Sequence, residues 1–201
     1  MRSWSAANLV PNQSNPGALA IGSGGSVYVL DQNACKVMKC RPEGALISSW
    51  GSEGSTPGQL EQPFGITSDH AGNIIVSDTY NHRMVKFDPE GNFVTSWGSL
   101  GDAPGQFNLP INPCTDLAGN IYVADSGNNR IQKFSPDGAL LCAWGTPGAA
   151  NGQFNDPAGV SVGPDGSIYV SDYNNYRVEK FGNAPTPTRS TSWGRIKAAY
   201  R

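Results

Sequence analysis

The chain has 201 residues, enough to bury one core, whereas four unrelated domains within this length would each bury too little apolar surface to be stable. Its 14 basic and 16 acidic residues give a formal charge of −2 and exclude the basic surface that a phosphate backbone or an anionic membrane requires. No stretch approaches the roughly 20 apolar residues of a membrane span, and residues 1–5 lack the apolar core of a secretory signal. We therefore expect no nucleic-acid or membrane partner, and either a cytoplasmic protein or one whose leader or upstream portion is missing from this sequence.

The sequence repeats itself four times with a constant period. The glycines that open the four copies recur every 47 residues, at Gly25, Gly72, Gly119 and Gly166. A proline stands nine residues before each of them, at Pro16, Pro63, Pro110 and Pro157. A fixed period of this size is typical of a repeat architecture. Residues 1–15 precede the first copy, and we interpret them as a lead-in whose Trp4 belongs to a stray outer strand.

Each copy contains four short segments with strand character. The second segment is nearly all apolar and rich in β-branched residues, which is typical of a strand covered on both faces. The first segment is clearest at Gly65–Thr67 and Gly159–Val162, and the second at Ile74–Ser77, Ile121–Ala124 and Ile168–Ser171. The third is clearest at Arg83–Phe87 and the fourth at Phe93–Trp97. Before the last few residues, no segment has the apolar stripe of a helix.

Proline and glycine mark the connections between these strands. The third and fourth strands are joined by Pro42-Glu43-Gly44 and its equivalents, in which proline presets φ and glycine accepts a positive φ, as a tight hairpin requires. A longer loop joins one copy to the next. The pattern predicts an all-β fold, a β-propeller built of four-stranded antiparallel blades, with four blades in this chain at residues 16–194.

Beyond a Pro-Thr spacer at Pro185–Thr188, the basic tail at residues 195–201 is either a frayed end or a docking peptide.

The third copy carries the most complete motif. The run Ile121–Phe134 (I-Y-V-A-D-S-G-N-N-R-I-Q-K-F), followed by Asp137-Gly138, Trp144-Gly145, Gly152-Gln153-Phe154 and Pro157, closely resembles the NHL repeat. The resemblance extends from Pro16 to Trp193. Two copies depart from it: the first has Ala34 and Lys36 where the others have Asn and Arg, and the third has Asn112-Pro113 in its first strand. Proline is tolerable there because the innermost strand of a blade is an edge strand.

The resemblance leaves the number of blades open. Proteins similar to this one usually close a ring of six blades, and four copies are visible here. The chain could therefore form a closed four-bladed ring, an open arc that a second chain completes as a homodimer, or a fragment of a longer propeller. Every copy is expected to hold all four of its strands, so that Trp4 competes with Trp193 for one position.

Residues that recur in every copy are expected to serve the blade rather than a ligand. An Asp ends the second strand, an Asn follows three residues later and an Arg two residues after that: Asp78, Asn81, Arg83, Asp125, Asn128, Arg130, Asp172, Asn175 and Arg177. One interpretation is a ring of carboxylates around a central cation site. We favour a structural turn motif, in which Asp and Asn cap the turn and the Arg pairs with the Asp. Trp50, Trp97 and Trp144 are likewise expected to pack between blades.

A ligand is then expected where the copies differ, at the end of the propeller that holds the second-to-third-strand turns and the loops between blades. Aromatic and amide side chains there suit a protein, peptide or glycan. The candidates are Phe64, Tyr80, His82, Ile111, Asn129, Tyr173 and Tyr176.

The residues needed for catalysis are scarce. The two histidines, His70 and His82, are expected at opposite ends of the blades, so no shared metal site follows. Propeller lyases and lactonases of similar fold need several converging His or acidic ligands, and the match does not extend to these. The RNA-binding NHL proteins use a basic face, which this chain lacks. We therefore expect a non-catalytic binding or scaffold module without cofactor or metal; the alternative is a fragment of a metal-dependent propeller lyase or hydrolase whose ligands lie elsewhere.

The four cysteines are interpreted as unpaired thiols rather than a disulfide or metal site. Cys40, Cys114 and Cys142 replace Phe, Thr or Ser of the other copies and are expected to be small buried substitutions. Cys35 aligns with His82, Asn129 and Tyr176, and we expect it to be more exposed, on one strand with Cys40.

Overall fold

The structure, a computed structural model, describes residues 15–182, and its regular elements there are β-strands and short 3-10 turns. The first blade holds β1 (Pro16–Ile21), β2 (Val27–Asp31), β3 (Lys36–Cys40) and β4 (Leu46–Trp50). The second holds β5 (Gly65–Ser68), β6 (Ile74–Asp78), β7 (Arg83–Phe87) and β8 (Phe93–Trp97). The third holds β9 (Pro110–Thr115), β10 (Ile121–Asp125), β11 (Arg130–Phe134) and β12 (Leu140–Trp144). The fourth holds β13 (Pro157–Val162), β14 (Ile168–Asp172) and β15 (Arg177–Phe181).

Every described blade is an antiparallel meander whose strands lie in chain order, and the first three blades confirm the predicted four-stranded blade and its strand segments. Each innermost strand (β1, β5, β9 or β13) lies at the edge of its sheet, and a 3-10 turn joins the second strand to the third: η3 (Thr79–Asn81), η4 (Ser126–Asn128) and η5 (Tyr173–Asn175). A further turn, η2 (Ser23–Gly25), joins β1 to β2. The expected fourth strand of the last blade, Trp4, Trp193, the spacer and the basic tail lie outside the described residues.

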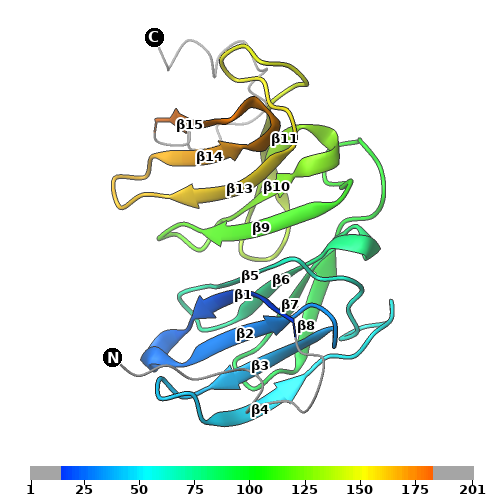
Figure 1. Cartoon of the computed structure of the whole chain (residues 1–201), viewed down its shortest axis with the longest axis vertical. Helices are drawn as coiled ribbons and strands as arrows, with labels where there is room; N and C mark the ends of the chain where they lie inside the picture. Colours follow the sequence, from blue (N-terminus) through cyan, green and yellow to red (C-terminus); the bar gives the residue numbers. More distant parts are fainter. Residues whose placement is uncertain (1–14, 183–201) are drawn as a thin grey trace.

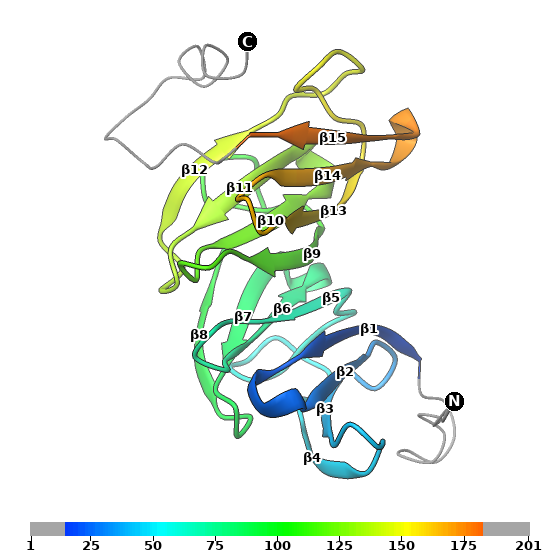
Figure 2. The same cartoon turned by 90° about the vertical axis from the view of Figure 1, so that its left-hand side faces the viewer.

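The blades stack side by side in one arc (Figures 1 and 2). Innermost strands follow one another in the order β1, β5, β9, β13, and each contacts the next. In both views the first and last blades lie at opposite ends of the long axis, so residues 15–182 form an open arc rather than a closed four-bladed ring. The inner strands line the concave side of this arc.

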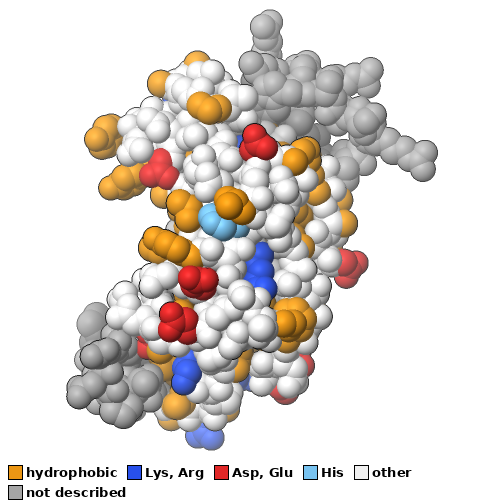
Figure 3. All heavy atoms as spheres, turned by 90° about the vertical axis from the view of Figure 1, so that its right-hand side faces the viewer, with side chains coloured by type: hydrophobic (Ala, Val, Ile, Leu, Met, Phe, Trp, Pro, Cys, Tyr) orange, Lys and Arg blue, Asp and Glu red, His pale blue; other side chains and the backbone are white. Residues whose placement is uncertain are grey.

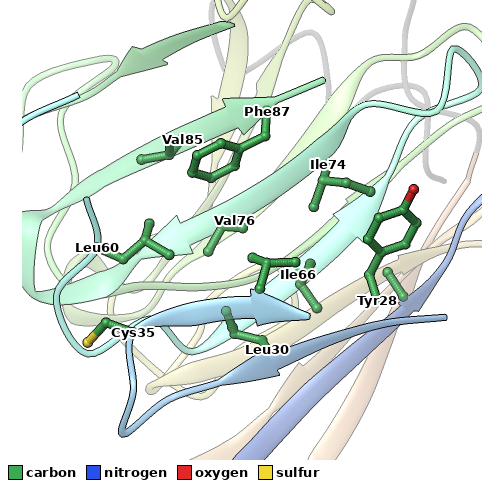
Figure 4. Close-up of a cluster of buried hydrophobic side chains, with 11 residues drawn as sticks. Tyr28, Leu30, Cys35, Leu60, Ile66, Ile74, Val76, Val85 and Phe87 are labelled. Carbon is green, nitrogen blue, oxygen red and sulfur yellow. The ribbon is translucent and has the colours of Figure 1, made fainter. Parts of the chain in front are cut away.

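The hydrophobic core lies between the blades. Between the first and second blades, Tyr28, Leu30 and Val37 meet Ile66, Ile74, Val76, Val85 and Phe87 (Figure 4). The loop that enters each blade adds one fully buried side chain to its junction: Leu60, Phe107 or Phe154. Because apolar burial is the main favourable term in folding, these junctions hold the arc together.

The repeated tryptophans pack between blades, as predicted. The Trp50 ring lies 6.1 Å from the Phe87 ring of the next blade, and Trp97 lies 5.9 Å from Phe134. The Trp144 ring lies 6.0 Å from that of Phe181. Tilted or edge-on ring pairs at such distances are favourable beyond the area that they bury.

The hairpins between third and fourth strands also form as predicted. Gly44, Gly91 and Gly138 have φ values of 91°, 93° and 84°, and each donates its N–H to the carbonyl three residues earlier. A side chain is disfavoured at such φ values, so glycine is required there.

The departure in the third copy is a bulge. The pairing of β9 with β10 shifts register beside Asn112, whose φ is 41°, and Pro113 follows on the free edge of the sheet. The bulge brings β9 very close to β5: a Cβ on Gly65 would lie 2.5 Å from the backbone nitrogen of Asn112. Glycine at position 65 therefore permits the close approach of two innermost strands.

The four cysteines are free thiols. Cys40 is buried as expected, whereas Cys114 and Cys142 are half-buried. Burial raises the pKa of Cys114 to about 12, and it also raises the pKa values of Cys40 and Cys142. The expectation for Cys35 was wrong on two points: it is buried, and it lies in the turn before β3 rather than on that strand. Its φ is 52°, and burial raises the pKa of its thiol.

Candidate functional site

The Asp-Asn-Arg motif holds the loop that enters each blade. In the third blade, Asp125 Oδ2 accepts hydrogen bonds from Arg130 Nε at 2.7 Å and Asn128 Nδ2 at 2.9 Å. Its Oδ1 accepts the backbone N–H of Asn108, at 2.7 Å, from the incoming loop. The Arg130 guanidinium donates to the carbonyls of three further loop residues: Asp102, Ala103 and Gln106. Burial raises the pKa of Asp125, and the hydrogen bonds from its partners oppose that shift.

The same bonds recur in the second and fourth blades. Asp78 accepts from Glu61 N and Arg83 Nε, and Asp172 accepts from Asn155 N and Arg177 Nε. Each carboxylate thus has its own cation and several donors, and it tethers a loop 17 residues upstream in addition to its own turn. These oxygens are occupied by protein groups, so they hold the scaffold beneath the loops.

The first blade lacks the Asn and the Arg, and its carboxylate has fewer partners. Asp31 Oδ1 accepts the backbone N–H groups of Asn15 and Ala34. Its Oδ2 is buried without a hydrogen-bond partner in the part of the chain that the structure describes. This blade therefore provides a natural comparison for the complete motif.

Two of the candidate ligand residues connect neighbouring blades. His82 and Asn129 follow their 3-10 turns in the left-handed conformation, with φ of 53° in both. His82 Nδ1 accepts the backbone N–H of Leu109 at 3.2 Å, and Asn129 Oδ1 accepts that of Asp156 at 2.9 Å. Both donors lie 27 residues later, in the loop that enters the next blade. The two side chains thus fix the relative position of successive loops.

A second pair of bonds crosses the same junctions. Thr79 Oγ1 donates to the carbonyl of Pro110 at 2.8 Å, and Ser126 Oγ donates to Asp156 Oδ1. Sequence reasoning did not single out these positions. The signal available in the sequence was a residue with a hydroxyl group at the same position of two copies.

Exposed apolar side chains remain at this end of the arc. Phe64, Tyr80 and Leu109 are exposed, and Ile111 is half-buried. We call these four residues the loop-end surface. Tyr80 is held near the incoming loop by its backbone N–H, which donates to the Glu61 carbonyl, and Leu109 is held by His82. Figure 3 shows this end of the molecule, with hydrophobic and acidic side chains around a histidine.

The last two candidates lie in the fourth blade. Tyr173 belongs to η5, the turn after β14, and Tyr176 follows that turn. Both are exposed, whereas the residues at the position of Tyr173 in the two preceding blades, Thr79 and Ser126, are buried by the next blade. These tyrosines therefore lie at the same end of their blade as the loop-end surface does, but no further blade within residues 15–182 covers them.

The opposite end of the arc holds a hollow that sequence reasoning missed. It has a volume of about 560 Å³ and lies among the first-to-second-strand turns of three blades. Its lining includes His70, Asp116, Leu117, Val162 and Pro164. Asp116 accepts hydrogen bonds from Asn120 and Tyr122, so its carboxylate already has protein partners. His70 therefore lies at the opposite end of the blade from His82, as the order of the strands predicted.

Within residues 15–182, no three His, Cys, Asp or Glu side chains converge as a metal site would require. No helix in the same range is long and apolar enough to cross a membrane.

The family model of the NHL repeat matches residues 60–87, 114–134 and 154–181, which correspond to the second, third and fourth blades. No curated protein sequence matches the chain.

Solved structures with the same fold include enzymes and a binding complex. A streptogramin B lyase has a TM-score of 0.63 and 18% identity, over 87% of this chain and 57% of its own. A catalytically inactive virginiamycin B lyase from Staphylococcus aureus, with quinupristin, has a TM-score of 0.64 and 14% identity, over 89% and 59%. A chain of a nidogen/laminin complex has a TM-score of 0.63 and 20% identity, over 82% and 59%. The chain thus spans less than two thirds of each, and identities this low show a common fold.

Proposed function

Because this chain is an NHL-repeat β-propeller, we propose that it is a non-catalytic binding or scaffold module that presents its loop-end surface to a protein, peptide or glycan. The observation that carries the proposal is a difference between two sets of side chains at this end of the arc. Polar groups that recur between copies are occupied by bonds between loops and blades, as for Asp125 and Asn128. The apolar side chains that differ between copies, Phe64 and Tyr80 among them, face solvent.

The physical properties of this surface suit a ligand with an apolar group. Aromatic side chains supply large contact areas at a low cost in conformational entropy, and they are enriched among the residues that dominate binding energy. The backbone beneath them is fixed by the hydrogen bonds at Glu61 and His82, so little further ordering is needed on binding. A nidogen/laminin complex among the structures of similar fold is consistent with a propeller that acts by binding.

The test is a selection of displayed random peptides, with a glycan array in parallel, against the immobilised 201-residue chain. We expect ligands whose affinity falls roughly thirtyfold in the double variant Phe64→Ser/Tyr80→Ser, equivalent to about 2 kcal/mol at a binding hot spot. Leu117→Ser is the matched control, because Leu117 is an exposed apolar residue at the opposite end of the arc. Selected ligands that bind the double variant as tightly as the wild type, or no selected ligand at all, would contradict the proposal.

The second candidate is a piece of a metal-dependent propeller lyase or hydrolase whose ligands lie in blades outside this sequence. It is favoured by the lyases of similar fold, of which this chain spans 57% and 59%. Elemental analysis of the purified chain separates the two functions. The binding module is expected to contain no stoichiometric zinc or calcium, and one equivalent of either metal would favour the enzyme instead.

A further inference from the structure

Within residues 15–182, no blade lies against one face of the fourth blade. We define its trailing face as Tyr169, Tyr173, Tyr176, Val178 and Lys180, whose equivalents in the preceding blades contact the next blade. Val178 is 66% exposed, whereas its equivalents Met84 and Ile131 are 0% exposed beneath the next blade. Tyr176 is 95% exposed. Exposed tyrosines around an aliphatic residue have the composition of an interface centre rather than of ordinary surface.

The first blade has a corresponding face on the side away from the second blade, which we call its leading face. The exposed residues of this leading face are Leu19 and Ile21 on β1. Leu19 is 64% exposed, whereas its equivalents Ile66 and Val160 are 7% and 8% exposed against a preceding blade. Deeper in this face, Val29, Met38 and Cys40 already form a buried cluster. A contact with this face therefore depends on the two exposed residues of β1.

A hydrogen bond from a lysine to a backbone carbonyl recurs at the internal junctions, and it indicates which groups of the two faces would meet. Lys39 Nζ donates to the carbonyl of Pro89 in the next blade at 2.9 Å, and Lys86 Nζ donates to that of Pro136 at 3.1 Å. Lys180 is the equivalent lysine on the trailing face, and Pro42 is the equivalent proline of the first blade. Lys180 is already held 5.4 Å from the centre of the Tyr169 ring, as Lys39 is held near Tyr28.

We propose that the trailing face of the fourth blade binds the leading face of the first blade in a second copy of this chain. Val178 and Tyr169 then cover Leu19 of the partner copy, and Lys180 reaches the carbonyl of its Pro42. This contact joins the two faces in the same order as the junctions that the chain builds between its own blades. It uses the exposed Leu19 and Ile21, because Val29, Met38 and Cys40 are already buried. A head-to-tail contact closes into a ring when two copies are related by a twofold axis, because each copy then supplies one face to each of two equal junctions.

Light scattering during size exclusion tests the proposal on the full chain. The wild type is expected at twice the chain mass of 21.2 kDa. Val178→Asp and Leu19→Asp, on opposite faces, are each expected to shift the protein to the monomer mass, because a buried unpaired carboxylate opposes association. Leu117→Asp places the same charge on an exposed leucine outside both faces and is expected to remain dimeric. All three positions are exposed, and circular dichroism verifies that each variant is folded.

Mixing the variants identifies the orientation. A mixture of Val178→Asp and Leu19→Asp chains retains one intact junction per mixed pair, so dimers are expected in the mixture and not in either variant alone. A dimer that persists in Leu19→Asp would mean that two trailing faces meet each other, and it would overturn the head-to-tail contact. A wild-type monomer, or a mass that keeps growing with concentration, would overturn the closed pair.

Discussion

Asp125→Ala is expected to lower the free energy of unfolding by about 3–5 kcal/mol, because it removes one partner of a buried ion pair. The Arg130 guanidinium would lose the carboxylate that Nε contacts at 2.7 Å. Asn128, Gln132 and the backbone N–H of Asn108 would each lose a hydrogen bond to the same carboxylate. For a chain of this size, each kcal/mol corresponds to roughly 2–4 °C in the midpoint of thermal unfolding. Urea unfolding followed by tryptophan fluorescence measures the loss.

Asp31→Ala is the control within the same molecule. Asp31 is also fully buried at the end of the second strand, but among the described residues its Oδ1 accepts two backbone N–H groups and no arginine contacts it. We expect a smaller loss, of about 1–3 kcal/mol, from donors left unsatisfied. Equal losses for the two variants would show that the arginine and asparagine add nothing. Lost ligand binding by Asp125→Ala at unchanged stability would contradict its structural assignment.

Gly65→Ala is expected to cost about 3 kcal/mol by forcing β5 and β9 apart. The added Cβ would lie 2.5 Å from Asn112 N, 2.6 Å from its Cα and 2.8 Å from Pro113 Cδ. Backbone atoms cannot rotate away as the end of a side chain can, so the junction between the second and third blades must shift. The measurement is the same urea titration, and the loss should appear as a lower midpoint.

Gly159→Ala tests whether the crowding, rather than the loss of glycine, is responsible. Gly159 holds the position of Gly65 in the fourth blade, but its nearest neighbour is the Ser171 hydroxyl, 3.3 Å from an added Cβ. That hydroxyl can rotate, so we expect a change of less than about 1 kcal/mol. If both alanine variants lost equal stability, the close approach of β5 and β9 would not be the reason for glycine at position 65.

The site was harder to predict than the blade. His82 and Asn129 were predicted as ligand residues because they vary between copies, yet each bonds an N–H group 27 residues later in the chain. Tyr173 and Tyr176 were grouped with them by position in the turn, and no further blade within residues 15–182 covers them. Cys35 is buried by its junction with the second blade although its equivalents His82 and Asn129 are polar. In each case the role depends on the neighbouring blade, which no pattern within one copy describes.

The sequence by itself determined the blade. The turn residues Pro89 and Gly91, the apolar run Ile121–Val123 and the 47-residue period specify strands, hairpins and their order, because each acts through backbone and side-chain preferences within a few residues. Only the tertiary structure decided that residues 15–182 form an open arc, which end holds a hollow and which faces are exposed. The physical reason is that these properties arise from contacts between blades, so the same position is buried in Ile131 and exposed in Val178 according to whether another blade covers it.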